Sequence, residues 1–192
     1  VSRNFADLQS QITGPSFVKI WETPNSGYSE RMKHVIEPFV NLRRVSSIDQ
    51  FDQIVQLEGI DAIVGGVTQI TYGFNNRIYA RLADAANSGV AREILTVSLS
   101  QSYYTDARAA QFDRQFATSF NGTPPSNFSP VALTVRADPT NTMGASLRAE
   151  YDTQFGALRT IGAEGTYDFR GLMQTTAGWS QRRFIEDLPG FD

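Results

Sequence analysis

The sequence predicts an all-β protein, an antiparallel up-and-down meander of about eight strands that is part of a large transmembrane β-barrel. Three observations support this fold class. Apolar and polar residues alternate with a period of two over long runs, which is typical of strands with two different faces. No apolar run approaches the roughly 18 residues that a membrane helix needs. Long and short connections alternate along the chain, as they do in outer-membrane barrels.

The N-terminal part of the chain is expected to hold two strands, over residues 16–22 and 31–43. Pro38 lies inside the second one. Because a proline has no N–H to donate to a β-ladder, the sequence predicts a bulge or a sheet edge at this position. The segment between the two strands contains Thr23-Pro24-Asn25-Ser26-Gly27, which is typical of a short turn.

The clearest strand covers residues 68–82. Its even-numbered positions from Ile70 onward are apolar, with Asn76 as the exception, and its odd-numbered positions include Arg77 and Arg81. A strand of a soluble protein typically has about five or six residues. The greater length of this one suits a tilted strand that crosses a bilayer and protrudes from it.

Five more strands are expected to complete the meander, over residues 92–105, 131–138, 144–154, 157–169 and 171–182. Short connections cover residues 83–91 and 139–143, and long loops cover residues 44–67 and 106–130. Outer-membrane barrels have short periplasmic turns and longer outer loops. The sequence therefore predicts that both long loops lie on the outer side, and that residues 1–192 form one partial outer-membrane β-barrel domain.

The apolar side of each strand is assigned to lipid and the polar side to the barrel lumen. An arginine at the bilayer midplane on the lipid side costs about 2–4 kcal/mol, so charged strand positions are expected to face the lumen. The lumen-facing candidates for binding are Arg77, Arg136, Arg148 and Glu150. The opposite charges also predict a pair across the sheet between Arg136 or Arg148 and Glu150 or Asp152. Aromatic residues near strand ends suit an interfacial girdle: Tyr103, Tyr151, Tyr167, Phe169 and Trp179.

Composition and charge exclude several classes of function. The net charge is −3, from 17 basic and 20 acidic residues without a basic stripe, so we expect no nucleic-acid partner. Without cysteine and with one histidine, the chain has too few soft ligands for a transition-metal site, and we expect no cofactor. The mean hydropathy of −0.29 fits a barrel and a soluble protein equally well. The chain begins at Val1 without a signal peptide, which suggests a piece of a longer protein.

The residues that could carry catalysis have simpler explanations, and we expect no enzymatic activity. A nucleophilic triad would have to use His34, which is more simply a packed or lumen-facing side chain of a strand. Gly65-Gly66 lacks the strand-to-helix context of a phosphate loop, and Asn121-Gly122-Thr123 fits a turn. Three carboxylate pairs fit a solvated face better than acid–base chemistry: Asp49 with Asp52, Glu150 with Asp152, and Glu186 with Asp187.

A series of motifs resembles the LptD family, also called the OstA or organic-solvent-tolerance family. The segment Arg31-Met32-Lys33-His34-Val35-Ile36-Glu37-Pro38 is similar to the family's "(F/M)KH-(V/L)-(I/L)-EP" strand. The next long loop contains Asp49-Gln50-Phe51-Asp52 and Gly59-Ile60-Asp61. Three strand motifs follow in the family's order: Thr71-Tyr72-Gly73-Phe74-Asn75-Asn76-Arg77-Ile78-Tyr79-Ala80, then Leu99-Ser100-Gln101-Ser102-Tyr103-Tyr104-Thr105-Asp106, then Arg148-Ala149-Glu150-Tyr151-Asp152. The resemblance covers about residues 14–182.

The resemblance implies that this chain is a middle-to-late segment of a large barrel in the cell outer membrane. Such a barrel receives lipopolysaccharide from periplasmic Lpt bridge proteins and inserts it into the outer leaflet. A plug lipoprotein, LptE, is expected inside the barrel and outer-membrane lipid around it. The family's periplasmic jellyroll and lateral-gate strands are not among these residues, so neither role is assigned to them.

Two alternatives stay open at the level of sequence. One is another outer-membrane barrel, such as a porin or a TonB-dependent receptor. The other is a soluble antiparallel β-sandwich that binds a ligand or a carbohydrate. Detergent dependence separates the membrane proteins from the soluble one, and loss of surface lipopolysaccharide on depletion separates the LptD family from other barrels.

Overall fold

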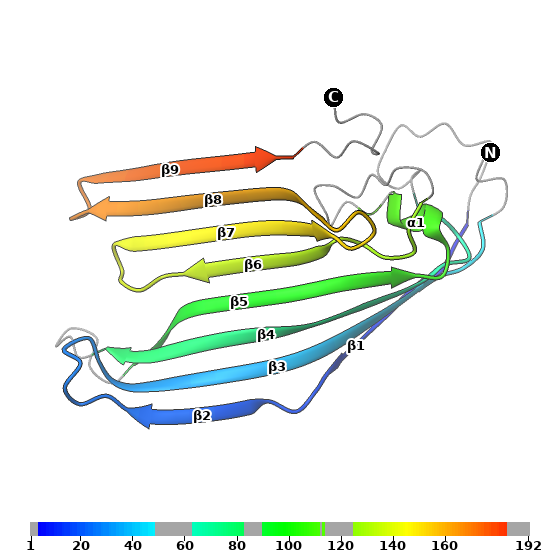
Figure 1. Cartoon of the computed structure of the whole chain (residues 1–192). Coiled ribbons are helices and arrows are strands. Elements are labelled where there is room, and N and C mark those ends of the chain that lie inside the picture. Colours follow the sequence, from blue (N-terminus) through cyan, green and yellow to red (C-terminus); the bar gives the residue numbers. More distant parts are fainter. Residues whose placement is uncertain (1–3, 49–62, 83–89, 112, 114–124, 184–192) are drawn as a thin grey trace.

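The computed structural model describes residues 4–48, 63–82, 90–111, 113 and 125–183. In these residues the chain forms one nine-stranded antiparallel sheet and one short helix (Figure 1). The predicted antiparallel meander is therefore confirmed. The elements are β1 (Asp7–Thr13), β2 (Phe17–Glu22), β3 (Ser29–Val45), β4 (Thr68–Leu82), β5 (Ala91–Tyr104), α1 (Ala107–Gln111), β6 (Val131–Ala137), β7 (Met143–Asp152), β8 (Ala157–Phe169) and β9 (Met173–Arg182).

The sheet follows the order of the chain, from β1 and β2 at one edge to β9 at the other. Each of β3 to β9 pairs antiparallel with its neighbours in sequence, and the two edges do not meet within the described residues (Figure 1). No second sheet packs on this one in the part of the chain that is described. This single layer contradicts the β-sandwich alternative, which needs two packed sheets.

Pro38 explains why β1 and β2 are two strands and not one. Both pair with β3, but the pairing is interrupted between Thr13 and Phe17, opposite Pro38. The Gly14 N–H donates to the Pro38 carbonyl at 2.8 Å, so the backbone of Pro38 points toward β1 and β2, where its missing N–H breaks the ladder. On its other side β3 pairs with β4 through this point, with Pro38 opposite Phe74. The break lies where the sequence predicts a bulge.

Register separates the strand residues into two faces. Because residues directly opposite each other in adjacent strands share a face, the pairs can be followed across the whole sheet. The apolar face includes Val40, Ile70, Tyr72, Phe74, Leu95, Val97, Leu99, Leu133, Val135, Leu147 and Trp179. The polar face includes Gln69, Arg77, Ser98, Thr134, Arg136, Arg148, Glu150 and Glu164.

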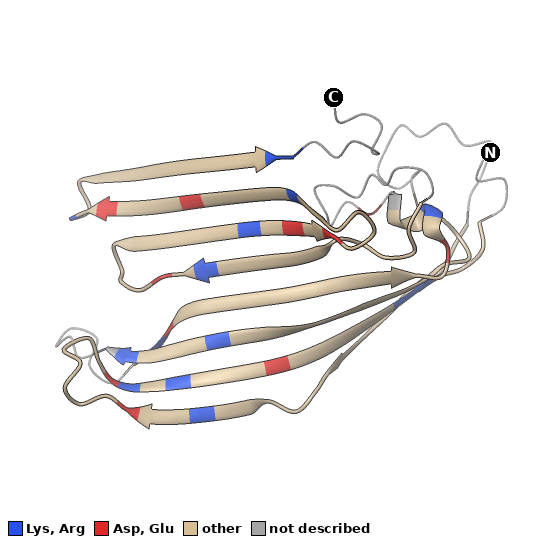
Figure 2. Ribbon diagram, viewed as in Figure 1, with Lys and Arg blue, Asp and Glu red and all other residues tan. Residues whose placement is uncertain are grey.

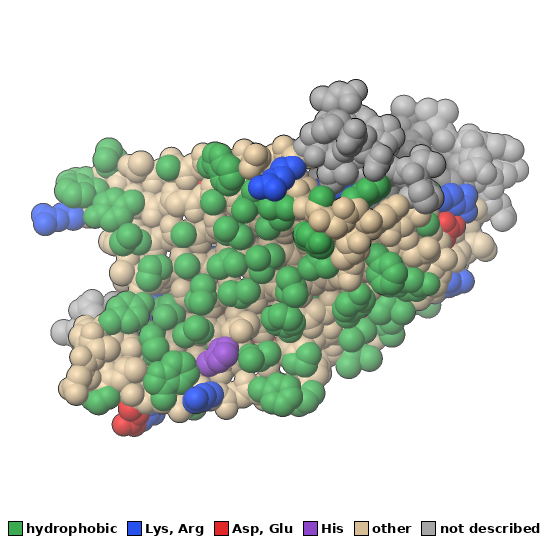
Figure 3. All heavy atoms as spheres, in the orientation of Figure 1, with side chains coloured by type: hydrophobic (Ala, Val, Ile, Leu, Met, Phe, Trp, Pro, Cys, Tyr) green, Lys and Arg blue, Asp and Glu red, His purple; other side chains and the backbone are tan. Residues whose placement is uncertain are grey.

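Figure 3 shows the apolar face, where hydrophobic side chains cover most of the surface and charged side chains are few. Several of these hydrophobic side chains are well exposed, including Tyr72, Phe74 and Trp179. A soluble monomer rarely exposes so extensive an apolar surface, so this face needs an apolar environment.

The two ends of the sheet differ in their connections. The two long connections, residues 46–67 and 105–130, leave from the same end, which we call the long-loop end. The turns at residues 23–28, 138–142 and 170–172 lie at the opposite end (Figure 1). One short turn, at residues 153–156, also lies at the long-loop end. The expected alternation of long and short connections is thus present as far as β7 and stops there.

Candidate functional site

The polar face holds all four of the predicted binding residues. Arg77 lies opposite Thr96, which in turn lies opposite Arg136. Arg148 lies opposite Thr134, and Glu150 lies opposite Ala132 on the same face. Figure 2 shows charged positions along the middle of several strands as well as at their ends. The polar face is therefore the part of the sheet that can contact hydrophilic ligands, and the binding roles of these four residues stay predictions.

Arg77 is held by acidic residues on both neighbouring strands. Its Nη1 lies 2.7 Å from Oε2 of Glu37 in β3, and its Nε lies 4.0 Å from Oε2 of Glu93 in β5. About a third of the arginine side chain is exposed. These contacts link three adjacent strands, so the ion pairs of Arg77 help to hold β3, β4 and β5 together.

Arg136 and Arg148 are the more accessible cations, with 72% and 54% of their side chains exposed. Arg136 Nε lies 2.7 Å from Asp138 Oδ2, and Arg148 Nη2 lies 3.5 Å from Glu150 Oε1. Both contacts join residues two apart in sequence, because alternate residues of a strand point to the same side. The sequence predicted that Arg136 or Arg148 pairs across the sheet with Glu150 or Asp152, whereas these two ion pairs join residues two apart along one stretch of chain.

The partner of Asp152 is Arg159, which sequence reasoning missed. Their side chains form an ion pair and are only 7% and 1% exposed. The register shifts here, with Glu150 opposite Thr160 but Tyr151 opposite Leu158, so Arg159 is the extra residue of a β-bulge. Without the bulge, alternation would place an arginine on the apolar face. An arginine at an apolar position of the alternating pattern is the sequence signal that could have predicted the bulge.

His34 lies on the apolar face, opposite Ile78, and not in the lumen-facing set. Its Nε2 lies 2.6 Å from Oδ1 of Asn76, the one polar residue that interrupts the apolar side of β4. Figure 3 shows the histidine with hydrophobic side chains around it and a basic side chain beside it, and Lys19 of β2 lies opposite His34. The two polar groups satisfy each other, which explains how both are accommodated on this face.

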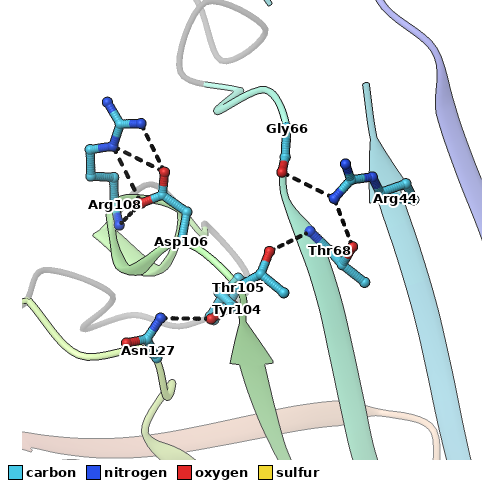
Figure 4. A network of polar contacts seen from close by, with 8 residues as sticks. All are labelled: Arg44, Gly66, Thr68, Tyr104, Thr105, Asp106, Arg108 and Asn127. Atoms are coloured by element: carbon cyan, nitrogen blue, oxygen red, sulfur yellow. Dashed lines mark hydrogen bonds and ion pairs between the residues drawn. The ribbon is translucent and has the colours of Figure 1, made fainter. Parts of the chain in front are cut away.

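A network of hydrogen bonds ties the two long connections together at the long-loop end (Figure 4). The Thr105 N–H donates to the Thr68 carbonyl at 3.0 Å, and the Thr68 N–H donates to Thr105 Oγ1 at 2.9 Å. Arg44 Nη1 donates to the Gly66 carbonyl at 3.0 Å and to Thr68 Oγ1 at 2.9 Å. Asn127 Nδ2 donates to the Tyr104 carbonyl at 2.8 Å.

Asp106 begins the helix that follows β5. Its Oδ1 accepts the Arg108 N–H at 2.9 Å, and its Oδ2 lies 2.8 Å from Arg108 Nη2 (Figure 4). These hydrogen bonds from Arg108 hold the pKa of the Asp106 carboxyl below its ordinary value. The Tyr-Tyr-Thr-Asp motif of the sequence therefore anchors loop residues, a role that its spacing alone did not predict.

A small apolar cluster at the same end of the sheet is formed by Val64, Val67, Tyr104 and Ala110. The Tyr104 hydroxyl contacts Asp113, which also accepts a hydrogen bond from Gln69 Nε2 at 3.2 Å. Residues of both long connections thus pack against the end of the sheet.

The comparisons with known proteins agree with this geometry. A family model described as "LptD: LPS transport system D" matches residues 31–176, well over half of the 192 residues. The chain belongs to the LptD family. The match runs from the start of the motif in β3 into β9, so both faces of the sheet and both long connections lie within the LptD region. A comparison with curated proteins found no match.

Membership confirms the family resemblance drawn from the motifs, and LptD is an outer-membrane family with a role in lipopolysaccharide transport. Within the described residues, no group of three or more His, Cys, Asp or Glu side chains is placed to hold a metal ion. No helix in that part of the chain is long and apolar enough to cross a membrane. Four sequence features lie outside the described residues: Asp49 with Asp52, Gly59-Ile60-Asp61, Asn121-Gly122-Thr123 and Glu186 with Asp187.

Proposed function

We propose that this chain forms part of the wall of an outer-membrane translocon that inserts lipopolysaccharide into the outer leaflet. The observation that carries the proposal is a single two-faced sheet of long strands in a chain of the LptD family. Strands β3, β4 and β5 have 17, 15 and 14 residues. A strand that crosses the hydrocarbon core at a tilt needs about 9–11 residues, so these strands are long enough to span it and extend beyond.

The apolar face would contact lipid in the complete barrel. In a spanning strand every backbone polar group must be paired, and a closed barrel meets that requirement. The open edges at β1 and β9 would pair with further strands of the same barrel, of which this chain is the middle-to-late segment. The His34–Asn76 pair would lie on the lipid side, where the two side chains hydrogen-bond each other.

The polar face would line the lumen. Lipopolysaccharide has a hydrophilic glycan with anionic groups and an apolar lipid, and a polar wall suits the glycan. Arg136 and Arg148 are the exposed cations that would meet its anionic groups, and Arg77 would complete that wall. The Glu150 side chain is fully buried, so it would hold Arg148 in place without touching the ligand. The same wall would contact the plug lipoprotein LptE, while periplasmic Lpt bridge proteins would deliver the substrate. Insertion changes no covalent bond, so no catalytic residue is required.

The orientation follows from the connections. The long-loop end would face the cell exterior and the opposite end the periplasm. On this basis β4 and β6 run toward the periplasm, and β5 and β7 run outward.

The proposal is tested by placing an arginine on each face of the same strand. Leu133→Arg puts a charge on the apolar face, where it would cost about 2–4 kcal/mol near the bilayer midplane. We expect little folded barrel and low surface lipopolysaccharide in cells depleted of the native protein. Thr134→Arg, the next residue and on the polar face, is the matched control and should assemble. Equal assembly of the two variants would contradict the membrane assignment.

A further inference from the structure

The polar face has a hollow near its long-loop end. The four predicted binding residues, Arg77, Arg136, Arg148 and Glu150, are not part of its lining. Its volume is about 410 Å³, and its polar-face lining consists of Gln9, Gln11, Asn41, Arg43, Gln69 and Thr71. These residues come from β1, β3 and β4. Three of the six are glutamines and one is an asparagine, so carboxamides dominate the lining.

Register explains why these side chains converge. Gln11 lies opposite Asn41, which lies opposite Thr71 on the next strand. One step along the strands on the same face, Gln9 lies opposite Arg43, which lies opposite Gln69. Each row therefore crosses three strands about 4.8 Å apart. The result is a two-row array of groups that can both donate and accept hydrogen bonds.

The hollow carries no uncompensated charge among its described residues. Arg43 is its one cation, and its Nε lies 3.0 Å from each oxygen of the Asp7 carboxylate, with Nη2 at 2.6 Å from Oδ2. This two-pronged contact neutralises the guanidinium and fixes its direction. The hollow thus differs from the region of Arg136 and Arg148, where both guanidinium groups are largely exposed.

Two observations show that hydrogen bonds position part of the lining and that one of its acceptors still lacks a donor. Gln69 Nε2 donates to Ser102 Oγ at 3.3 Å and to Asp113 Oδ2 at 3.2 Å, which positions that amide. Asn41 Oδ1 is buried and has no hydrogen-bond donor within the described part of the chain. A buried acceptor without a donor is destabilising, and a ligand hydroxyl would remove the penalty once the neighbouring side chains moved aside to expose the oxygen.

We propose that this hollow is a binding site for an uncharged, hydroxyl-rich glycan segment. Sugar hydroxyls donate and accept hydrogen bonds, as carboxamides do, so the chemistry of the two matches. A phosphate or carboxylate would find no free cation there. The proposal rests on the proposed function, since it assigns the neutral sugars of the transported glycan to this end of the polar face and the anionic groups to the arginines.

The test uses the full-length barrel protein that contains this chain, folded in detergent micelles. The probe is the oligosaccharide released from lipopolysaccharide by mild acid and then dephosphorylated, and its binding is measured by saturation-transfer NMR and titration. Asn41→Leu removes the buried acceptor with little change in volume, and we expect about tenfold weaker binding. Gln11→Leu alters an exposed position of the lining and should also weaken binding, so a folding defect at position 41 would not leave the proposal untested.

Gln174→Leu is the matched control, because Gln174 is an exposed carboxamide on the polar face of β9, away from the hollow. It should bind the oligosaccharide like the wild type, and inorganic phosphate should not compete. Absence of binding to the folded wild type, equal binding by all variants, or competition by phosphate would each overturn the proposal. The two proposals can fail separately. If the wild type binds no oligosaccharide but cells with either variant still display surface lipopolysaccharide, the glycan site is refuted and the translocon assignment is not.

Discussion

Individual polar residues of this sheet are placed in matched groups on both faces. His34 pairs with Asn76 on the apolar face, and Asp152 pairs with Arg159 on the polar face. His34 and Asn76 both break the alternation of their strands, and Arg159 breaks that of β8. A buried polar group without a partner costs about 1–3 kcal/mol, so the partner makes each exception easier to accommodate.

The His34–Asn76 pair can be tested by a double-mutant cycle. His34→Leu alone or Asn76→Leu alone leaves one polar group without its partner on the apolar face, and each should lower the free energy of unfolding by about 1–3 kcal/mol. The double variant should be close to the wild type, because both polar groups are then gone. Urea titration of the barrel in lipid vesicles measures this. Additive losses in the double variant would show that the two side chains do not interact.

The Asp152–Arg159 ion pair should matter more for folding than the exposed arginines do. Arg159→Met leaves a buried carboxylate without its cation, which typically costs about 3–5 kcal/mol. Arg136→Met, at a side chain that is 72% exposed and whose partner Asp138 is 30% exposed, should cost less than about 1 kcal/mol. The urea midpoints of the two variants provide the comparison.

A second-site change tests the reason for the Arg159 effect. Adding Asp152→Asn to Arg159→Met removes the uncompensated charge and keeps an oxygen that can accept the Gln154 N–H, so part of the loss should be recovered. No recovery would mean that packing of the arginine, and not its charge, is what stabilises the bulge.

At this scale the sequence predicted the face of a residue better than its partner. Arg77, Arg136, Arg148 and Glu150 share the polar face because alternation alone determines it. The partner of a residue depends on strand register and on bulges, and the period-two pattern of a sequence does not reveal either of them. Arg159 was missed for that reason, since its face is set by the register shift beside Tyr151.

At the scale of elements, β3 organises the N-terminal half of the sheet. It has 17 residues and pairs with β4 along nearly its whole length, while β1 and β2 share its other side. The long strands were predictable because many alternating residues repeat the same signal. β1 was not, because it has seven residues and Ser10 interrupts the alternation of Leu8 and Ile12. The five-residue α1 likewise leaves no periodic trace.

The pairing of β4 with β5 depends on Gly73. A Cβ at this position would lie 2.1 Å from the Leu99 carbonyl oxygen and 3.0 Å from Cζ of Phe39. Gly73→Ala should therefore push the two strands apart and lower the folded fraction. Gly165→Ala, in β8, is the control, because a Cβ there meets nothing within 4 Å. Heat-shifted mobility on gels reports the folded fraction, and equal yields of the two variants would refute the close approach.

At the scale of the whole molecule, the sheet has one apolar face and one polar face over seven consecutive strands. That division was predictable, because it needs only the period of two and no partner assignment. The separation of neutral from charged regions on the polar face was not, because the carboxamide hollow combines three strands distant in sequence. Both features suit a barrel wall with lipid on one side and a hydrophilic passage on the other.

The central claim, that the apolar face meets lipid and the polar face meets water, is tested most directly at two neighbouring residues of β5. Val97 lies on the apolar face opposite Val135, and Ser98 lies on the polar face opposite Thr134. The chain has no cysteine, so Val97→Cys and Ser98→Cys in the full-length protein would each introduce one thiol into this segment. We predict that a water-soluble thiol reagent labels position 98 in intact outer membranes and labels position 97 only after denaturation. Labelling of position 97 as readily as position 98 would contradict the account.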